Sequence, residues 1–400
     1  MNQTAHITAI QTPVSRQASG SAAGSPFLGL IDPLLVEEPV VHVFAGSVSR
    51  TAALAVWTWV KRDVLPGLAD AGITAVETAA ELERVLPQLL PAMKAALEKA
   101  DTDTEAQRRL RAQIGRDDAR SEVSTILFAL RHRAVLAKAQ GFGRAVNAMA
   151  EDAGLPAALQ SMPLQDANLA AIVFHAAVGQ VANPTRLVTA AIRLSGNATE
   201  GAIQRTGLGP MIDAFLAHAQ NQIHVLKLGG PFADIDLVCR SLDRFHRLIR
   251  ALTGYVEFPR NSRSTAALSA ITKLVSDRVE PRLKEVVTDL NIAMRRPREG
   301  ADRVDNDHIL AAINGIYLLA AVRDCRDSLA LNAIFDQAWS QSAQALELHI
   351  QRNLDLLRKD PDDVHTGARL DAAITMAQVR FNTEYADTLR RARLAAERRG

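Results

Sequence analysis

Residues 236–255, with the sequence DLVCRSLDRFHRLIRALTGY, place a cysteine, an aspartate and a histidine within a few helical turns. Nucleophilic catalysis by a cysteine needs its sulfur within hydrogen-bond reach of a histidine nitrogen. Cys239 and His246 are seven positions apart, which corresponds to about 10 Å along a single helix axis. This spacing favours a structural role, while Asp243 and His246 are kept as candidate catalytic residues.

The same segment carries a polar stripe beside an apolar stripe, and both follow helical spacing. The polar stripe lies at the border of the buried face, where Asp243 is expected to reach His246 at i,i+3 and to raise the basicity of its ring. We therefore interpret the segment as one flank of an amphipathic helix. Its apolar stripe consists of Val238, Leu242, Phe245, Ile249 and Leu252.

Histidines on separate segments provide the material for a site assembled from several helices. If they converge on one pocket together with Asp213 or Asp243, the chain is a helical enzyme or a metal-binding protein. If they are dispersed among apolar neighbours, that hypothesis fails. The histidines concerned are His175, His218, His224 and His246.

Sequence motifs for metals and cofactors are absent. The Glu-x-x-His pairs of di-metal helical proteins, Cys-x-x-Cys and His-Glu-x-x-His do not occur. Asp-x-x-His occurs twice, but in DNDH the residue Asp305 or Asp307 is expected to cap a helix. Glycine-rich phosphate loops and the Gly-x-Ser-x-Gly turn are also missing. We predict no metal site and no cofactor.

Five residues are candidates for contacts with a partner. Trp57 and Trp59, at i,i+2, cannot share one helix face, so either both fill the core or one reaches a partner surface. Arg390, Arg391 and Arg393 could contact phosphates, an acidic protein or anionic lipid. Arginines near a helix C-terminus are also favoured simply by the helix dipole. Few aromatic residues accompany them, which argues against a nucleic-acid partner.

The composition is typical of packed helices. Hydrophobic residues make up 48% of the 400 residues, while aromatic residues make up only 4%, which favours helices over sheets. The formal net charge of +2 gives no general attraction to nucleic acid or membranes. Two cysteines are too few for a disulfide framework. No apolar run reaches the length of a membrane span, so no integral membrane segment is expected.

Residues 1–28 are predicted to form a disordered polar tail. Up to residue 26 the only charged side chain is Arg16, and few apolar groups are available for burial. The segment lacks the features of a cleaved signal peptide. We expect a cytoplasmic protein, with export through the uncleaved N-terminus as the alternative.

Helical patterns fill the rest of the chain. A Gly- and Asn-rich stretch at residues 195–210 suggests a division into an N-terminal lobe, 29–200, and a C-terminal lobe, 201–400. Prolines are expected to interrupt several helices. The predicted helices include one ending near Pro66–Gly67, one stopped by Pro87 and Pro91, a short one at 92–100, a long one from Asp117 to about Ala153, one at 262–296 kinked at Pro281, and one at 364–398.

The fold class predicted is therefore all-α, a multi-helix bundle or irregular helical array in about two lobes. With no recognisable catalytic motif, we expect a non-enzymatic protein-interaction module, an adaptor or scaffold with an unidentified protein partner. A secreted effector or a component of a secretion apparatus is a variant of this hypothesis. The sequence leaves open whether the chain forms a homo-oligomer.

Overall fold

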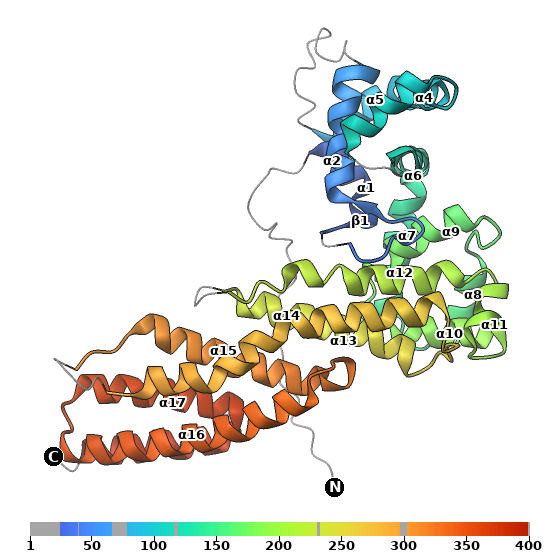
Figure 1. The fold of residues 1–400 in the computed structure, drawn as a ribbon. Helices are drawn as coiled ribbons and strands as arrows, with labels where there is room; N and C mark the ends of the chain where they lie inside the picture. The colour runs from blue at the N-terminus through green and yellow to red at the C-terminus, as the bar shows by residue number, and fades with distance from the viewer. Residues whose placement is uncertain are drawn as a thin grey trace.

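The computed structural model describes residues 25–38, 40–65, 78–115, 119–229, 233–296 and 302–398. Within these ranges the regular structure is almost entirely helical, which confirms the all-α prediction (Figure 1). The strands there are two short parallel segments, β1 (Leu35–Val36) and β2 (Val48–Ser49). The predicted tail lies outside the described residues up to position 24. Its last residues were wrongly assigned, because Phe27 and Leu28 are buried in a helix.

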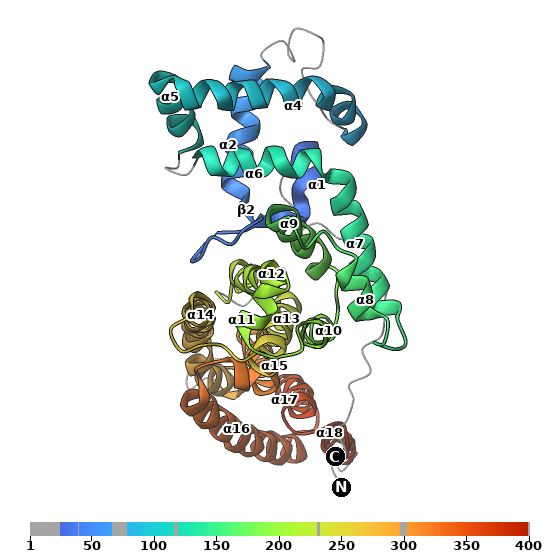
Figure 2. The ribbon, with the colours of Figure 1, turned by 90° about the vertical axis from the view of Figure 1, so that its right-hand side faces the viewer.

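The N-terminal lobe forms the upper part of Figure 1, and Figure 2 shows α4 and α6 lying across α2. Ser49 caps α2 by accepting a hydrogen bond from the Ala52 amide, as expected for a serine at a helix start. The helices of this part are α1 (Pro26–Ile31), α2 (Arg50–Trp59, continued by a π-helical turn Val60–Val64), α4 (Ala79–Thr102), α5 (Thr104–Ile114), α6 (Ala119–Arg131) and α7 (Arg133–Ala148).

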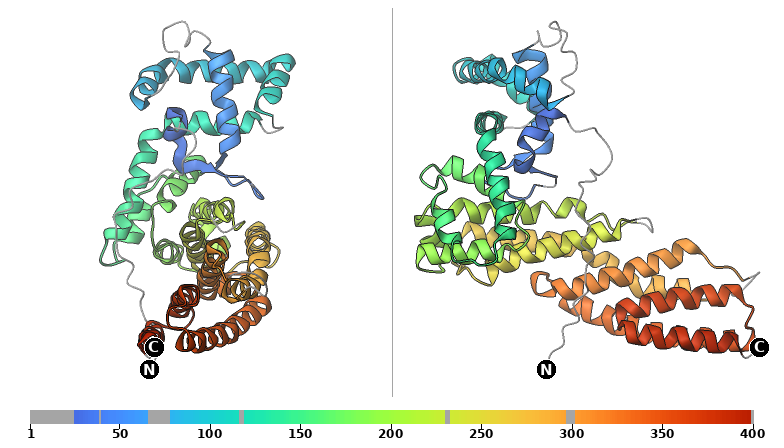
Figure 3. Two further views of the ribbon diagram at one scale, coloured as in Figure 1. Left: turned by 90° about the vertical axis from the view of Figure 1, so that its left-hand side faces the viewer. Right: turned by 180° about the vertical axis from the view of Figure 1, so that it is seen from behind.

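A central layer and a C-terminal bundle follow, and the bundle projects away from the N-terminal lobe (Figures 1 and 3). The central helices are α8 (Leu155–Gln160), α9 (Ala167–Val178), α10 (Thr185–Ser195), α11 (Glu200–Arg205), α12 (Gly209–Gln220) and α13 (Ile235–Thr253). The bundle consists of α14 (Arg263–Met294), α15 (Asn306–Cys325), α16 (Asn332–Lys359), α17 (Val364–Arg380) and α18 (Thr383–Glu397).

Three prolines that were expected to interrupt helices do not end them. Pro87 and Pro91 lie inside the continuous helix α4, and Pro281 lies inside α14. All three are exposed, and so are Glu83 and Asp277, whose carbonyls lose a partner when the residue four positions on is proline. Water can solvate these carbonyls while the opposite face stays packed, so each helix continues.

The long helix predicted from Asp117 to Ala153 is wrong, because the chain turns between α6 and α7 at His132 (Figure 2). His132 leaves helical geometry at ψ 18°, and its Nδ1 lies 2.8 Å from the Phe128 carbonyl oxygen. The expected start at Asp117 lies outside the described residues, as does Pro66–Gly67. The helix expected at 364–398 is also two helices, since Asn382 caps α18 by accepting from the Tyr385 amide.

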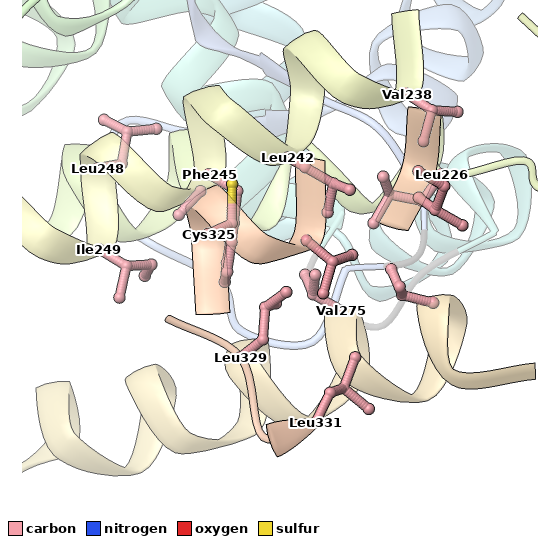
Figure 4. Packing of buried hydrophobic residues seen from close by; sticks show 14 of the residues in the cluster. Leu226, Val238, Leu242, Phe245, Leu248, Ile249, Val275, Cys325, Leu329 and Leu331 are labelled. Carbon is pink, nitrogen blue, oxygen red and sulfur yellow. The ribbon is translucent and has the colours of Figure 1, made fainter. Parts of the chain in front are cut away.

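Buried side chains form two clusters, and α9 belongs to both. Ile172, Val173 and Ala176 face the N-terminal cluster, whereas Phe174 and Val178 face the larger central and C-terminal cluster. The cores therefore meet around α7 and α9, well before the boundary expected at residue 200. Figure 4 shows part of the larger cluster, in which side chains of α13 pack against the end of α15 and the start of the next segment.

Helix α15 with its following turn, Asn306–Ser328, is the one stretch of the described chain long and apolar enough to cross a membrane by length and composition alone. Its most apolar 18-residue window has a mean hydropathy of 1.2, and the helix packs against α13, α14 and α17. Arg323 and Asp324 lie within it. Of the residues in that window 39% are buried, and this single stretch gives no clear integral membrane segment.

Helices α7 and α9 approach so closely at Gly143 that no side chain fits between them. A Cβ atom on Gly143 would lie 2.3 Å from the Ala177 carbonyl oxygen and 2.9 Å from the Gln180 Cβ. On the same helix, a Cβ on Gly141 would meet nothing closer than the Arg144 guanidinium at 4.0 Å. The packing of α7 on the shared helix therefore depends on Gly143.

We predict that Gly143→Ala lowers the free energy of unfolding by about 1–3 kcal/mol, because the helices must separate. Gly141→Ala is the matched control, and it should raise that free energy by up to about 1 kcal/mol through helix propensity. Urea unfolding followed by circular dichroism measures both. Equal effects of the two substitutions would contradict the close approach.

Candidate functional site

The cysteine–aspartate–histidine segment on α13 is a set of separate packing contacts. His246 Nδ1 lies 2.9 Å from the Ser328 hydroxyl, and Asp243 forms an ion pair with Arg247 at 2.8 Å. Asp243 raises the pKa of His246, as the i,i+3 spacing predicts, but it does not set the net direction of the shift. Burial and the nearby Arg250 lower the pKa of His246, and they outweigh Asp243. Burial raises the pKa of Cys239 to about 11, which leaves its thiol protonated and unreactive.

His175 on α9 and His218 on α12 do come together, but inside the core. Their ring centroids are 5.7 Å apart. His218 Nε2 donates to the His175 carbonyl at 2.8 Å, and His175 Nε2 donates to the Ala45 carbonyl at 3.0 Å. Burial lowers the pKa of His175 to about 4 and that of His218 to about 3. Both rings are therefore neutral donors that hold backbone in place.

The remaining histidine candidate, His224, lies after the end of α12, where its ring contacts the Asn221 carbonyl. The four histidines thus do not converge on one pocket with Asp213 or Asp243. Among the described residues, no group of three or more histidine, cysteine or acidic side chains is placed to hold a metal ion. The arrangement gives no support to a histidine-based catalytic centre.

Both tryptophans lie in the N-terminal core. Trp57 and Trp59 are buried, and the Trp57 ring stacks on Phe27 with centroids 4.7 Å apart. Neither ring is therefore available as a partner contact in this structure. Their positions agree with the alternative interpretation, in which both rings fill the core.

The three arginines of α18 contact neighbouring side chains of their own chain. Arg390 forms an ion pair with Asp387, and Arg391 donates to the Thr388 hydroxyl. Arg393 pairs with Asp371 of α17 at 3.0 Å and with Glu397 at 3.4 Å. These contacts partly neutralise the cluster and reduce its attraction for phosphates.

Residues 40–47, which we call the strap, cross from the N-terminal lobe to the central helices. Gln220 of α12 accepts from the Val41 and His42 amides and donates to the His42 carbonyl. Arg263 of α14 donates to the Val43 carbonyl at 2.7 Å. Together with His175, these side chains fasten the strap from three helices.

A hollow of about 610 Å³ opens beside the Arg263 end of the strap, between α11, α12 and α14. Glu200 lies on its wall and is only 5% exposed. Its Oε1 accepts hydrogen bonds from Ser264 of α14 and, at 3.2 Å, from Gln204 Nε2. Asp213 of α12 contributes a second carboxylate. The hollow therefore brings two acidic side chains from different helices together.

Arg263 is the one positively charged side chain lining this hollow in the described chain. Its Nη1 lies 3.9 Å from Asp213 Oδ2, and its guanidinium carbon is 5.7 Å from the centre of the Phe44 ring. Burial raises the pKa of Asp213, Arg263 opposes that rise, and the charge of Glu200 adds to it. The single positive charge of Arg263 thus only partly balances the two carboxylates, Glu200 and Asp213.

The sequence pointed to Asp213 in this hollow but missed Glu200, Arg263 and Ser264. Residues 195–210 were interpreted as a boundary because of their glycines and asparagine, which obscured helix α11. One signal was present, since Thr199 precedes Glu200 and caps α11 by accepting from the Ala202 amide. No family model, curated protein or solved structure matches the chain, so the site is interpreted from its own geometry.

The buried histidine pair predicts a loss of stability below neutral pH. The pKa values of both rings lie below the ordinary value of about 6.5, so the unfolded chain binds more protons than the folded chain as pH falls below that value. The stabilisation is complete above about pH 6.5 and is lost towards about pH 4 and 3. Each histidine contributes up to about 1.4 kcal/mol per pH unit.

The measurement is the free energy of unfolding between pH 7.5 and 5.5, where most carboxylates stay ionised. His218→Gln keeps a side-chain donor near the His175 carbonyl but does not titrate, so the loss of stability on acidification should become smaller. His246 and His349 contribute in the same direction, which leaves a residual slope. An unchanged slope in His218→Gln would show that this ring is not held neutral.

Proposed function

We propose that the chain is a non-enzymatic protein-interaction module, an adaptor or scaffold that acts through its helix faces. The observation that carries this proposal is the extended arrangement of the helices (Figures 1 and 3). Helix α14 alone has 32 residues, or about 48 Å, and joins the central layer to the projecting bundle. Such an array presents long faces on which a partner can lie.

The projecting bundle also exposes large apolar side chains. Leu348 on α16 is 67% exposed, and Val364 at the start of α17 is 78% exposed. Leu394 on α18 is exposed as well. Apolar side chains on outward helix faces are the anchors by which helices recognise helical partners. They support a protein partner more than a nucleic acid.

The enzyme alternative has less support from the geometry. It requires His175, His218, His224 and His246 to meet in an accessible pocket with an acid. Instead, each of them contacts a backbone carbonyl or a serine within the packing. Of the two that meet, His175 is buried and His218 is half-buried. We also propose a cytoplasmic location, with export through the N-terminus as the variant.

The interaction hypothesis predicts a partner at a fixed stoichiometry. Full-length protein should capture it from the native lysate, and the purified partner should re-bind with a defined mass by light scattering. A variant that starts at residue 25 tests the N-terminal segment without removing the buried Phe27 and Leu28. Failure of any protein to re-bind, together with stoichiometric metal or a retained small molecule, would favour the enzyme alternative.

The export variant makes a separate prediction. Residues 1–24 fused to a reporter should be released by cells that carry a specialised secretion system, and a fusion of the same segment in scrambled order should not. Equal retention of both fusions would remove the export variant and leave the scaffold proposal unaffected.

A further inference from the structure

Glu200 differs from two other buried charged residues, Arg369 and Arg380, in how its charge is compensated. Arg369 is paired with Asp302, and Arg380 lies 3.5 Å from the centre of the Trp339 ring while donating to a carbonyl. Glu200 receives hydrogen bonds from Ser264 and Gln204, but among the described residues it makes no ion pair with a lysine, arginine or histidine. Its charge is therefore held in the wall of an open hollow without a cation.

Such an arrangement is costly for the free protein. A carboxylate removed from water loses its hydration, and neutral hydrogen bonds compensate only part of that loss. The usual compensation is a positive charge brought into contact. Because the hollow reaches the Glu200 wall, that positive charge can arrive with a ligand.

The charges around the hollow sum to a net negative value. Arg263 lies at 3.9 Å from Asp213, and its Nη2 donates to the Val43 carbonyl of the strap. It can offset the charge of Asp213, but it is not in contact with Glu200. The side chain of Asp213 is 23% exposed, so this second carboxylate is accessible to a ligand.

We propose that this hollow binds an organic cation, an alkylammonium or guanidinium group, whose N–H groups donate to Glu200 and Asp213. Bonds of this type between an N–H cation and a carboxylate are among the stronger protein hydrogen bonds. A metal ion fits less well, because the described residues here offer two carboxylates and no third acidic, histidine or cysteine ligand. A volume of about 610 Å³ suits a small ligand or one inserted side chain.

The cation has two sources with the same chemistry. It is either a free small amine or guanidine, or the lysine or arginine side chain of a partner protein. The first source is independent of the interaction function proposed above. The second rests on that function, and it would make the hollow the place where the partner is recognised.

The test is isothermal titration calorimetry of the full-length protein in low-salt phosphate buffer. The probes are butylamine, butylguanidine and the blocked tripeptide acetyl-Gly-Arg-Gly-amide. Glu200→Gln keeps the acceptor for Ser264 but removes the charge. Glu257→Gln is the matched control, because Glu257 is exposed and its carbonyl accepts from the Glu200 amide, yet its side chain does not line the hollow.

We expect one probe molecule per chain and a dissociation constant that rises at least about tenfold in Glu200→Gln, since a charge-assisted hydrogen bond is lost. Glu257→Gln should stay near the unmodified value.

Binding of the small probes would identify a free ligand, and binding of the tripeptide alone would identify a partner side chain. Loss of partner re-binding in the earlier experiment would leave the small-probe result standing. If Glu200→Gln fails to fold, Asp213→Asn decides by the same titration. The proposal is overturned if no probe binds the unmodified chain, or if the variants bind as tightly as it does.

Discussion

Beyond its first turn, helix α9 is buried on every side, and the polar side chains of the core are arranged around that constraint. Its residues 170–178 are all buried, because two hydrophobic clusters close on opposite faces of one helix. An unpaired buried polar group costs about 1–3 kcal/mol, so neighbouring helices supply donors. His218 donates to the His175 carbonyl, and Arg244 donates to Val178 at the C-terminal end of the helix. Polar residues that resemble catalytic groups in the sequence therefore serve to complete the hydrogen bonding of the core.

The all-α class follows from composition and periodicity, and the helix start marked by Asp305 lies where the sequence places it. Helix ends were less predictable. A proline frees a carbonyl in the preceding turn, and where that carbonyl faces outward water can solvate it and the helix can continue. Conversely, the turn at His132 contains neither glycine nor proline, and it precedes α7, which packs against α9. Both errors come from tertiary contacts that a local pattern does not contain.

The candidate sites, too, are only partly predictable from the sequence. Residue type selected the histidines, but their chemistry is set by burial, which only the fold determines. The acidic hollow could not be assembled from the sequence, because Glu200 and Ser264 are hydrogen-bonded across 64 positions. Of its residues, the sequence indicates only Asp213, as a partner for histidines that lie elsewhere. The net charge of this hollow depends on side chains from three helices, and no short sequence motif contains all of them.

Helix α14 gives the hollow a mechanical connection to the far end of the molecule. Its first residues, Arg263 and Ser264, contact the strap and Glu200, whereas its last turns belong to the bundle with α15 and α16. A continuous helix moves as a stiff lever, so a tilt of about 6° at the hollow shifts the other end of this 48 Å rod by about 5 Å. Any tilt of α14 at the hollow would therefore displace the distant surface of the bundle.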